Sequence, residues 1–287
     1  MLSSLNEAQV FSLEDFTRLT RHFTMTYSSE FVAYRGQVCA SWKLVSSIGR
    51  EFPANKYSWT ECLEMEWEYL TIFENMSLPY LKQSSSNIWE LMVIAQHHGL
   101  PTRLLDWTLN PLVGLYFAIG RPTDKYVNED GAVWFYYNSR ALGTISTINR
   151  VAILSEVKAR NSKQQIDSIF DDEFKESLRS LYFFSCSKNF KNPLPDNYPF
   201  QPPLSDPRII SQESVFTIPT VPQFEFDSTL IPKGDQLLKI IVPATAKAAL
   251  RTELERTAGI HEASMFPGLD GIARQIVDRI SRKKNNA

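Results

Sequence analysis

The chain has 287 residues, of which 43% are hydrophobic and 22% are charged, and its formal net charge at pH 7 is −2. This composition is typical of a globular protein with one large domain or two small ones, and it excludes fibrous, collagen-like and extensively disordered chains. Because the net charge is close to zero, nucleic acid could be held only by a local basic patch.

The first predicted element is a helix over residues 12–23. Ser12 precedes two acidic residues, and apolar residues then recur from Phe16 to Phe23, which is the pattern of a capped amphipathic helix that packs on the main body. The next run, residues 31–34, is β-prone and favours a short strand, which is expected to end at Arg35 and Gly36.

Two further helices are predicted over residues 59–73 and 88–98. Leu, Met, Trp and Glu recur there with helical spacing, and a glycine and a proline stop the second helix. Another apolar run begins near Pro111, and either Asp106 or Thr108 is expected to cap the helix that it forms.

Residues 132–137 and 236–243 are rich in β-branched and aromatic side chains and favour strands. A mixture of such strands with the helices predicts an α+β fold. Residues 190–207 contain six prolines and are expected to form an ordered surface loop. The basic run at residues 282–284 is expected to be a solvated tail.

The three cysteines, Cys39, Cys62 and Cys186, match neither a disulfide framework nor the spacing of a zinc site. The N-terminus lacks the pattern of a signal peptide, and no apolar run is long enough to predict a membrane span. The sequence therefore predicts a cytoplasmic protein with no membrane partner.

Arg35 and Gly36 form the first candidate site. An arginine at a strand end can present its planar guanidinium to a phosphate, and a neighbouring glycine allows a ligand to approach the backbone. The alternative is an ordinary surface arginine beside a turn glycine.

Gln96, His97 and His98 form a second polar cluster at the end of an apolar helix. Adjacent side chains on a helix point about 100° apart, so the two histidines cannot easily bind one metal ion. No metal site is therefore predicted, and a histidine that interacts with the helix dipole is the simpler interpretation.

Arg103 and Asp106 form the third candidate, which has two interpretations. A buried pair would fix a loop through a charge-assisted hydrogen bond. Alternatively, Asp106 and Thr108 would orient a phosphate or pyrophosphate at the N-terminus of the helix that begins near Pro111. The sequence contains no glycine-rich phosphate loop that would indicate a conventional nucleotide-binding fold.

Several segments together resemble the FRG domain. Residues 34–44 contain YRGQ and WKL, which are similar to the pattern that gives this family its name. Residues 95–108 read AQHHGLPTRLLDWT and resemble the family's most characteristic segment almost throughout. Residues 208–216 and 266–271 are similar to two later family motifs, although Ser214 stands where glycine is usual.

The resemblance covers residues 31–275 and implies a chain of three parts. Residues 1–30 would be an N-terminal helical extension, residues 31–275 the FRG domain, and residues 276–287 a basic C-terminal tail.

The order of the motifs is also similar to that of ADP-ribosyltransferases of the Arg-Ser-Glu type. These enzymes carry an arginine at the end of a first strand, then an S-T-S element before a helix, and then an E-x-E element in a later strand. Here Arg35, Thr108 and residues 212–219 follow in the same order. The resemblance implies an ADP-ribosyltransferase-like split β-sheet core with several helices, and NAD as co-substrate.

The same resemblance implies roles for individual residues. Cleavage of the bond between nicotinamide and ribose passes through an oxocarbenium-like state, so it requires a phosphate-binding arginine, a polar residue for the ribose and a nearby negative charge. The expected catalytic residues are Arg35, His97, Asp106, Gln212 and Glu213. The expected cofactor-binding residues are Arg35, Gly36, Gln37, Arg103, Thr108 and Arg208.

The carboxylate departs from the pattern, because the expected E-x-E reads Gln212-Glu213-Ser214. Glu213 is one residue out of register, and in a strand this shift turns the side chain to the opposite face. Either Gln212 takes the ribose role while Asp106 or Asp270 supplies negative charge, or catalysis is absent.

These expectations favour an NAD-dependent ADP-ribosyltransferase-like toxin or anti-phage effector that modifies a macromolecule and has a neutralising antitoxin or regulatory protein. Nucleic acid is favoured over protein as the acceptor, because Lys158, Arg160 and Lys163 could join residues 282–284 in a local basic rim.

Two alternatives remain from other classes of function. One is a non-catalytic module that binds a nucleotide or a peptide terminus. In the other, the motifs are structural, with Arg103 and Asp106 as a buried pair and the function carried by residues 126–200.

Overall fold

A single β-sheet of seven strands organises the described part of the chain, with the strand order β4-β5-β6-β2-β1-β3-β7. The computed structural model describes residues 7–27, 31–80, 88–138, 143–144, 198–202, 206–219, 221–227 and 234–285. The strands are β1 (Phe31–Gln37), β2 (Leu105–Thr108), β3 (Gly131–Asn138), β4 (Gly143–Thr144), β5 (Tyr198–Gln201), β6 (Ser214–Ile218) and β7 (Gln236–Val242).

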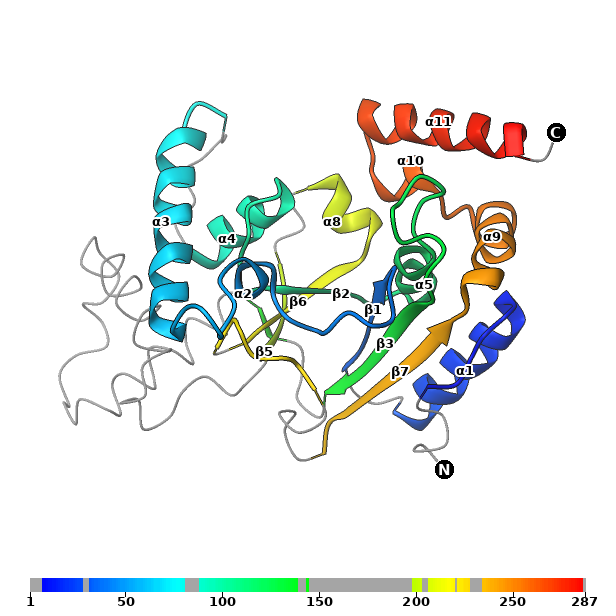
Figure 1. The fold of residues 1–287 in the computed structure, drawn as a ribbon, viewed down its shortest axis with the longest axis horizontal. Helices are drawn as coiled ribbons and strands as arrows, with labels where there is room; N and C mark the ends of the chain where they lie inside the picture. The colour runs from blue at the N-terminus through cyan, green and yellow to red at the C-terminus, as the bar shows by residue number, and fades with distance from the viewer. Residues whose placement is uncertain are drawn as a thin grey trace.

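Helices surround this sheet (Figure 1). The helices are α1 (Leu13–Thr26), α2 (Ser47–Glu51), α3 (Trp59–Ser77), α4 (Ile88–His97), α5 (Pro111–Ile119), α8 (Pro207–Ser211), α9 (Ala244–Glu253), the π-helical turn η2 (Leu254–Ala258), α10 (Glu262–Met265) and α11 (Leu269–Asn285). The six strands from β5 to β7 in this order pair antiparallel, and β4 pairs parallel to β5. The predicted α+β class is therefore confirmed.

The sheet is weakly joined at its centre, between β1 and β2. Strand β1 pairs with β3 along all seven of its residues, and β2 pairs with β6 along all four of its own. In contrast, β1 and β2 pair only where Tyr34 faces Thr108. Beyond this pair the two strands separate, and in Figure 1 β2 runs across the direction of β3 and β7. Arg35 and Asp106 lie on the two sides of the opening.

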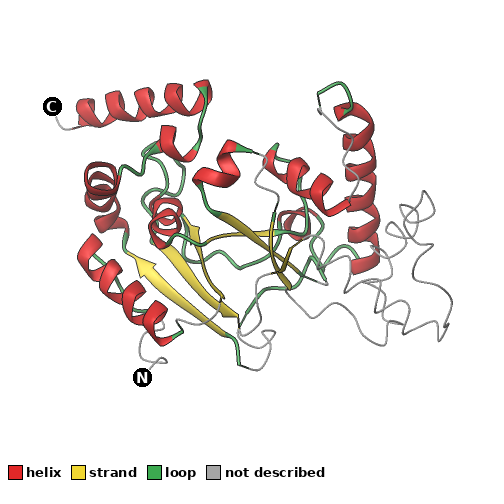
Figure 2. Cartoon of the chain, turned by 180° about the vertical axis from the view of Figure 1, so that it is seen from behind, coloured by secondary structure: helices red, strands yellow, loops and turns green. Residues whose placement is uncertain are grey.

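The N-terminal helix is an integral part of the main hydrophobic core. Ser12 caps α1 as predicted, and its hydroxyl accepts a hydrogen bond from the backbone N–H of Asp15. Phe16 and Phe23 are buried and both contact the ring of Phe135 on β3. Figure 2 shows α1 lying along the edge of the sheet near α9. Residues 7–27 therefore share a core with the rest of the chain.

A second core lies under α3 and α4, on the other half of the sheet. Trp89 and Met92 of α4 pack there with Leu70 of α3 and with Phe200 and Phe216 of strands β5 and β6. The helices predicted over residues 59–73 and 88–98 are thus confirmed, and the first of them extends to Ser77. The strands predicted over residues 132–137 and 236–243 are confirmed as β3 and β7.

The residue that caps α5 is Asn110, whose side chain accepts a hydrogen bond from the backbone N–H of Leu112 at 3.0 Å. The predicted caps, Asp106 and Thr108, are wrong, because both belong to β2. Four consecutive residues pair there with β6, and this pairing over a long sequence separation determines the local conformation.

The proline-rich segment contains strand β5, so the prediction of a surface loop over residues 190–207 is wrong for that part. Pro199 pairs antiparallel with Thr217, and Phe200 is fully buried. The residues before Tyr198 lie outside the described ranges. Proline restricts hydrogen bonding but still allows a short strand such as this one.

The basic run at residues 282–284 lies in α11, which continues to Asn285. The predicted boundary between residues 275 and 276 therefore falls inside one helix. Within the described ranges, every helix is too short or too polar to cross a membrane. Cys39 and Cys62 are buried free thiols, and Cys186 lies outside the described residues.

Candidate functional site

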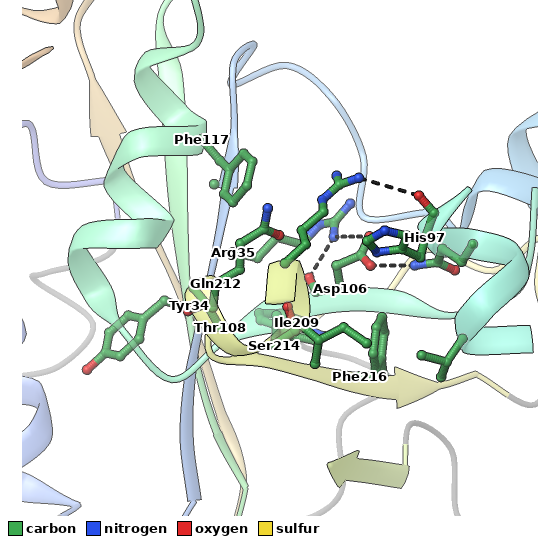
Figure 3. A pocket seen from close by; sticks show the side chains of 15 residues that line it. Tyr34, Arg35, His97, Asp106, Thr108, Phe117, Ile209, Gln212, Ser214 and Phe216 are labelled. Atoms are coloured by element: carbon green, nitrogen blue, oxygen red, sulfur yellow. Dashed lines mark hydrogen bonds and ion pairs between the residues drawn. The ribbon is translucent and has the colours of Figure 1, made fainter. Parts of the chain in front are cut away.

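A cavity of about 250 Å³ lies where β1 and β2 separate (Figure 3). Strand β1 contributes Arg35 to its wall, and β2 contributes Asp106. The end of α4 contributes His97, and α8 contributes Arg208 and Ile209. The opening of the sheet thus brings together polar side chains that are far apart in the sequence.

Arg35 bridges the two strands across this opening. Its Nη1 donates a hydrogen bond to the main-chain carbonyl of Asp106 at 2.6 Å and lies 3.5 Å from Oδ2 of the same residue. The side chain of Arg35 is only 17% exposed, and its Nε has no hydrogen-bond partner among the described residues. A guanidinium held in place with a remaining donor is suited to an incoming anion.

Asp106 is held from two sides. Besides the contact with Arg35, its Oδ1 accepts a hydrogen bond from the side-chain amide of Gln96. The amide oxygen of Gln96 in turn accepts a hydrogen bond from the hydroxyl of Thr102. This network fixes the carboxylate and reduces the negative charge that it presents to the cavity.

Arg208 and His97 form the opposite wall. The guanidinium of Arg208 lies over the ring of Phe266, 4.6 Å from its centre, and its Nη1 donates to the carbonyl of His97 at 3.4 Å. Burial lowers the pKa of Arg208, and neighbouring Arg274 lowers it further, whereas the carboxylate of Asp106 opposes this shift. A bound anion would stabilise such a buried guanidinium.

The imidazole of His97 lies with its Nε2 3.5 Å from Oδ2 of Asp206. Burial lowers the pKa of His97 despite this carboxylate, and the positive charge of Arg208 acts in the same direction as burial. His97 is therefore neutral at pH 7 and can accept or relay a proton.

The hydroxyl of Thr108 joins β2 to the turn before β6. It donates to the carbonyl of Gln212 at 2.7 Å and accepts from the backbone N–H of Asn110 at 3.0 Å. The side-chain amide of Gln212 donates to the carbonyl of Met265 at 2.8 Å. Both residues line the cavity, but these hydrogen bonds already use the hydroxyl of Thr108 and the amide nitrogen of Gln212.

Glu213 points away from the cavity. It is exposed, and its Oε1 accepts a hydrogen bond from the side-chain amide of Asn110 at 2.9 Å. Gln212 ends α8, Glu213 has a left-handed backbone with φ of 46°, and β6 begins only at Ser214. The argument from alternating strand faces is therefore wrong at these positions, because Gln212 and Glu213 form a turn.

Arg103 does not reach the cavity. Its guanidinium is 1% exposed, and its Nε donates to Oε2 of Glu66 at 2.6 Å. The backbone N–H of Arg103 donates to the other oxygen of the same carboxylate. The predicted pair with Asp106 is therefore wrong, because Glu66 of α3 occupies the position opposite Arg103. The structure likewise gives Arg103 no access from which to bind a cofactor.

Gly36 allows helix α5 to approach strand β1 closely. A Cβ atom at this position would lie 2.0 Å from the carbonyl oxygen of Gly114 and 2.5 Å from the backbone nitrogen of Ala118, both on α5. The next residue, Gln37, is buried and accepts a hydrogen bond from the indole of Trp134 at 2.7 Å. Gln37 lines a second, larger cavity.

This second cavity has a volume of about 910 Å³ and shares Arg35, Gly36 and Phe117 with the first. Its wall includes Arg50, whose pKa is lowered first by burial and then by the positive charge of Arg35. It also includes Trp42, which packs edge-to-face on another aromatic ring. Arg35 therefore stands at the junction of the small and the large cavity.

The sequence-based site contained neither the large cavity nor several of its residues. Trp42 belongs to the first family-like segment, and Arg50 follows that segment by six residues, so both could have been included on that signal. Glu262 and Arg274 also line the large cavity, and they lie just outside the family-like segment 266–271, on α10 and α11. In the described ranges, no group of three or more His, Cys, Asp or Glu side chains is arranged to hold a metal.

Comparison with known proteins identifies one family. Residues 30–126, which extend from the start of β1 past the end of α5, match the family model of the FRG domain. Neither the curated proteins nor the solved structures include a match to the chain. The segments around Gln212 and Phe266 lie beyond the matched range. The chain therefore contains an FRG domain, to which Arg35, His97, Asp106 and both strands at the opening of the sheet belong.

Proposed function

We propose that this FRG-domain protein binds NAD at the opening between β1 and β2 and transfers its ADP-ribose group to a macromolecule. The observation that carries the proposal is the position of Arg35, held at 2.6 Å by the carbonyl of Asp106 at the junction of the two cavities. Arg35 and Thr108 also lie on adjacent strands, and Gln212 and Glu213 directly precede the next strand, in the sheet order β6-β2-β1. This arrangement fits an ADP-ribosyltransferase-like split sheet.

The cavities fit the parts of a dinucleotide. The small cavity alone is below the range of typical ligand pockets, which is about 300–1,000 Å³, whereas the large one is near its upper end. Arg35 and Arg208 would hold the pyrophosphate, since a guanidinium matches phosphate geometry with two parallel hydrogen bonds. Phosphate bound to Arg35 would also compete with its contact to Asp106.

In the proposed reaction, the bond between ribose C1′ and the nicotinamide nitrogen breaks, and its electron pair leaves with nicotinamide. A nucleophilic oxygen or nitrogen of the acceptor then bonds to C1′ and loses its proton. Neutral His97 is the group at the cavity that could accept this proton. Negative charge beside the ribose would stabilise the oxocarbenium-like state.

One observation favours a second function, which is nucleotide binding without turnover. Among the carboxylates considered from the sequence, Asp106 is held by Arg35 and Gln96, and Glu213 points to Asn110. Asp270 is exposed and lines a separate cavity near α11. A protein in which none of these groups reaches the ribose would bind the nucleotide and release no nicotinamide.

The acceptor is proposed to be RNA or DNA, with protein as the other class. The basic residues that motivated this choice, Lys158, Arg160 and Lys163, lie outside the described residues, as do the side chains of residues 282–284. A toxin or anti-phage role, with an antitoxin or regulatory protein as partner, remains part of the same proposal.

The test measures nicotinamide release from NAD by the purified protein in the presence of RNA, DNA and cell lysate. The informative variant is Arg35→Ala, and the matched control is Arg18→Ala, which removes an exposed arginine of α1 that pairs with Asp15. Thermal unfolding tests whether both variants are folded, and calorimetry measures their affinity for NAD.

We expect the wild type and Arg18→Ala to release nicotinamide, and folded Arg35→Ala to release none. NAD binding without release would replace the transferase with the binding module. If the wild type neither binds NAD nor releases nicotinamide, both functions are wrong.

A further inference from the structure

A buried carboxylate lies on the wall of the large cavity, on an element that the family model does not cover. Glu262 is the first residue of α10, its side chain is 3% exposed, and it lines the same cavity as Arg35. The phenol of Tyr116 donates a hydrogen bond to its Oε2. Its other oxygen, Oε1, is buried and has no hydrogen-bond partner among the described residues.

Two arginines lie near this oxygen without donating a hydrogen bond to it. Nη1 of Arg274 is 3.5 Å from Oε1 and Nε of Arg121 is 3.9 Å away. Arg121 is also paired with Asp278 at 3.4 Å. Both arginines bring positive charge close to the carboxylate, yet a buried acceptor without a donor is unfavourable. A hydroxyl group supplied by a ligand would satisfy it.

Access to Oε1 depends on Arg274. This side chain is 42% exposed, lies over the ring of Phe266 at 5.1 Å and lines the large cavity beside Glu262. A long side chain at the edge of a cavity can turn into solvent at small energetic cost. Movement of Arg274 would therefore open the buried oxygen to a ligand in the cavity.

The remainder of the wall suits a nucleotide. Arg35 and Arg50 provide positive charge for phosphate. At another part of the wall, Trp42 packs edge-to-face on Tyr126, with the ring centres 4.9 Å apart, and offers an aromatic surface for a base. Oε1 of Glu262, a buried acceptor without a hydrogen bond from the described residues, then corresponds to the hydroxyl-bearing part of the ligand, the ribose.

We propose that the large cavity binds a ribonucleotide with its phosphate on Arg35 and with a ribose hydroxyl donating a hydrogen bond to Oε1 of Glu262. This inference rests on the proposed function, in which that ribonucleotide is part of NAD. Glu262 would then be the carboxylate beside the ribose that Asp106, Glu213 and Asp270 do not provide.

The test separates recognition of the ribose from a structural role of Glu262. Calorimetry measures the affinities of AMP and nicotinamide mononucleotide, one for each half of NAD, and of their 2′,3′-dideoxy forms. Wild-type protein is expected to bind one of the ribonucleotides about tenfold more tightly than its dideoxy form, as is usual for a hydrogen bond to a charged group. In Glu262→Gln this preference is expected to fall below about twofold.

The matched control is Glu64→Gln, which neutralises an exposed carboxylate of α3 that does not line this cavity. It is expected to keep the full preference for ribose. If Glu262→Gln does not fold, Glu262→Asp replaces it, because aspartate keeps the charge opposite Arg121 and Arg274 while it withdraws the carboxylate from the ligand. The same loss of preference is expected.

The outcomes distinguish this inference from the proposed function. An unchanged ribose preference in folded Glu262→Gln would refute the role of Glu262, and nicotinamide release by the wild type would still support the transferase. Loss of the preference in a protein that releases no nicotinamide would support the ribose contact and refute the transferase. If the wild type binds neither ribonucleotide nor NAD, both are refuted.

Discussion

The guanidinium of Arg103 on the approach to β2 lies against the carboxylate of Glu66 on α3, with Nε 2.6 Å from Oε2 and with both side chains at most 1% exposed. The same carboxylate accepts a hydrogen bond from the backbone N–H of Arg103. This pair fixes the segment that leads into β2 against α3, and it thereby positions Asp106 three residues later.

Removal of either partner should destabilise the fold. Glu66→Ala leaves a buried guanidinium without its carboxylate, and such a loss typically costs about 3–5 kcal/mol of the free energy of unfolding. Urea unfolding measures the change, and Glu64→Ala, at an exposed position of the same helix, is the control. If Arg103→Ala instead kept the stability of the wild type and lost affinity for NAD, this would indicate that Arg103 binds the ligand, as the sequence predicts.

Gly36→Ala should also destabilise the protein, because its added Cβ would lie 2.0 Å from a backbone oxygen of α5. Backbone cannot move aside as a flexible side chain can, so the expected loss is about 1–3 kcal/mol or more. Gly114→Ala is the comparison, since its nearest contact is the Cβ of Tyr34 at 3.0 Å and alanine favours a helix. Equal losses in the two variants would contradict this account of the packing of α5 on β1.

Elements fixed by neighbouring residues could be predicted from the sequence. The cap at Ser12 and the helices α3 and α4 depend on side chains within a few positions, as do the apolar runs of β3 and β7. Local patterns of this kind can be recognised in the sequence without knowledge of the tertiary contacts.

Features that depend on distant pairing could not be predicted. The local pattern around Asp106 and Thr108 indicates a helix cap, because nothing within the segment shows that β6, more than 100 residues later, pairs with it. The partner of Arg103 was missed for the same reason, since Glu66 resembles any other helical glutamate until the fold buries it. Glu262 likewise belongs to the site only through its place on the wall of the large cavity, which no local sequence pattern indicates.

The site was predicted in part. Arg35, His97, Asp106 and Arg208 do meet around one cavity, although they come from four different elements. What the motifs could not reveal is which polar groups the fold already uses internally. Thr108 is the clearest case, because its hydroxyl both donates and accepts within the protein.

Thr108→Val should therefore reduce stability more than affinity. The substitution keeps the shape of the side chain but leaves the carbonyl of Gln212 and the N–H of Asn110 without their partner. Buried groups left in this way cost about 1–3 kcal/mol. Urea unfolding and NAD calorimetry on the same samples check the prediction. A loss of NAD affinity with unchanged stability would indicate instead that Thr108 contacts the ribose.

His97 should make the protein less stable in mild acid. Burial lowers its pKa in the folded state below the ordinary value of 6.5, and the charges of Arg208 and His98 add to this effect while Asp206 opposes it. As the pH falls through about 6.5, the unfolded chain takes up a proton at this residue before the folded protein does. The free energy of unfolding must then decrease with falling pH until the pKa of the folded state is passed.

The measurement compares urea unfolding at several pH values between 5 and 8 for the wild type and for His97→Gln, which has no proton to gain in this range. The wild type should lose more stability than the variant as the pH falls from about 7 to 5.5. His22→Gln, at an exposed position on α1, controls for the general loss of a histidine and should follow the wild type. If His97→Gln loses stability as steeply as the wild type, another group produces the pH dependence. The same comparison can be made with a nucleotide present. If the wild type and His97→Gln then lose stability equally as the pH falls, phosphate bound to Arg208 would account for the change.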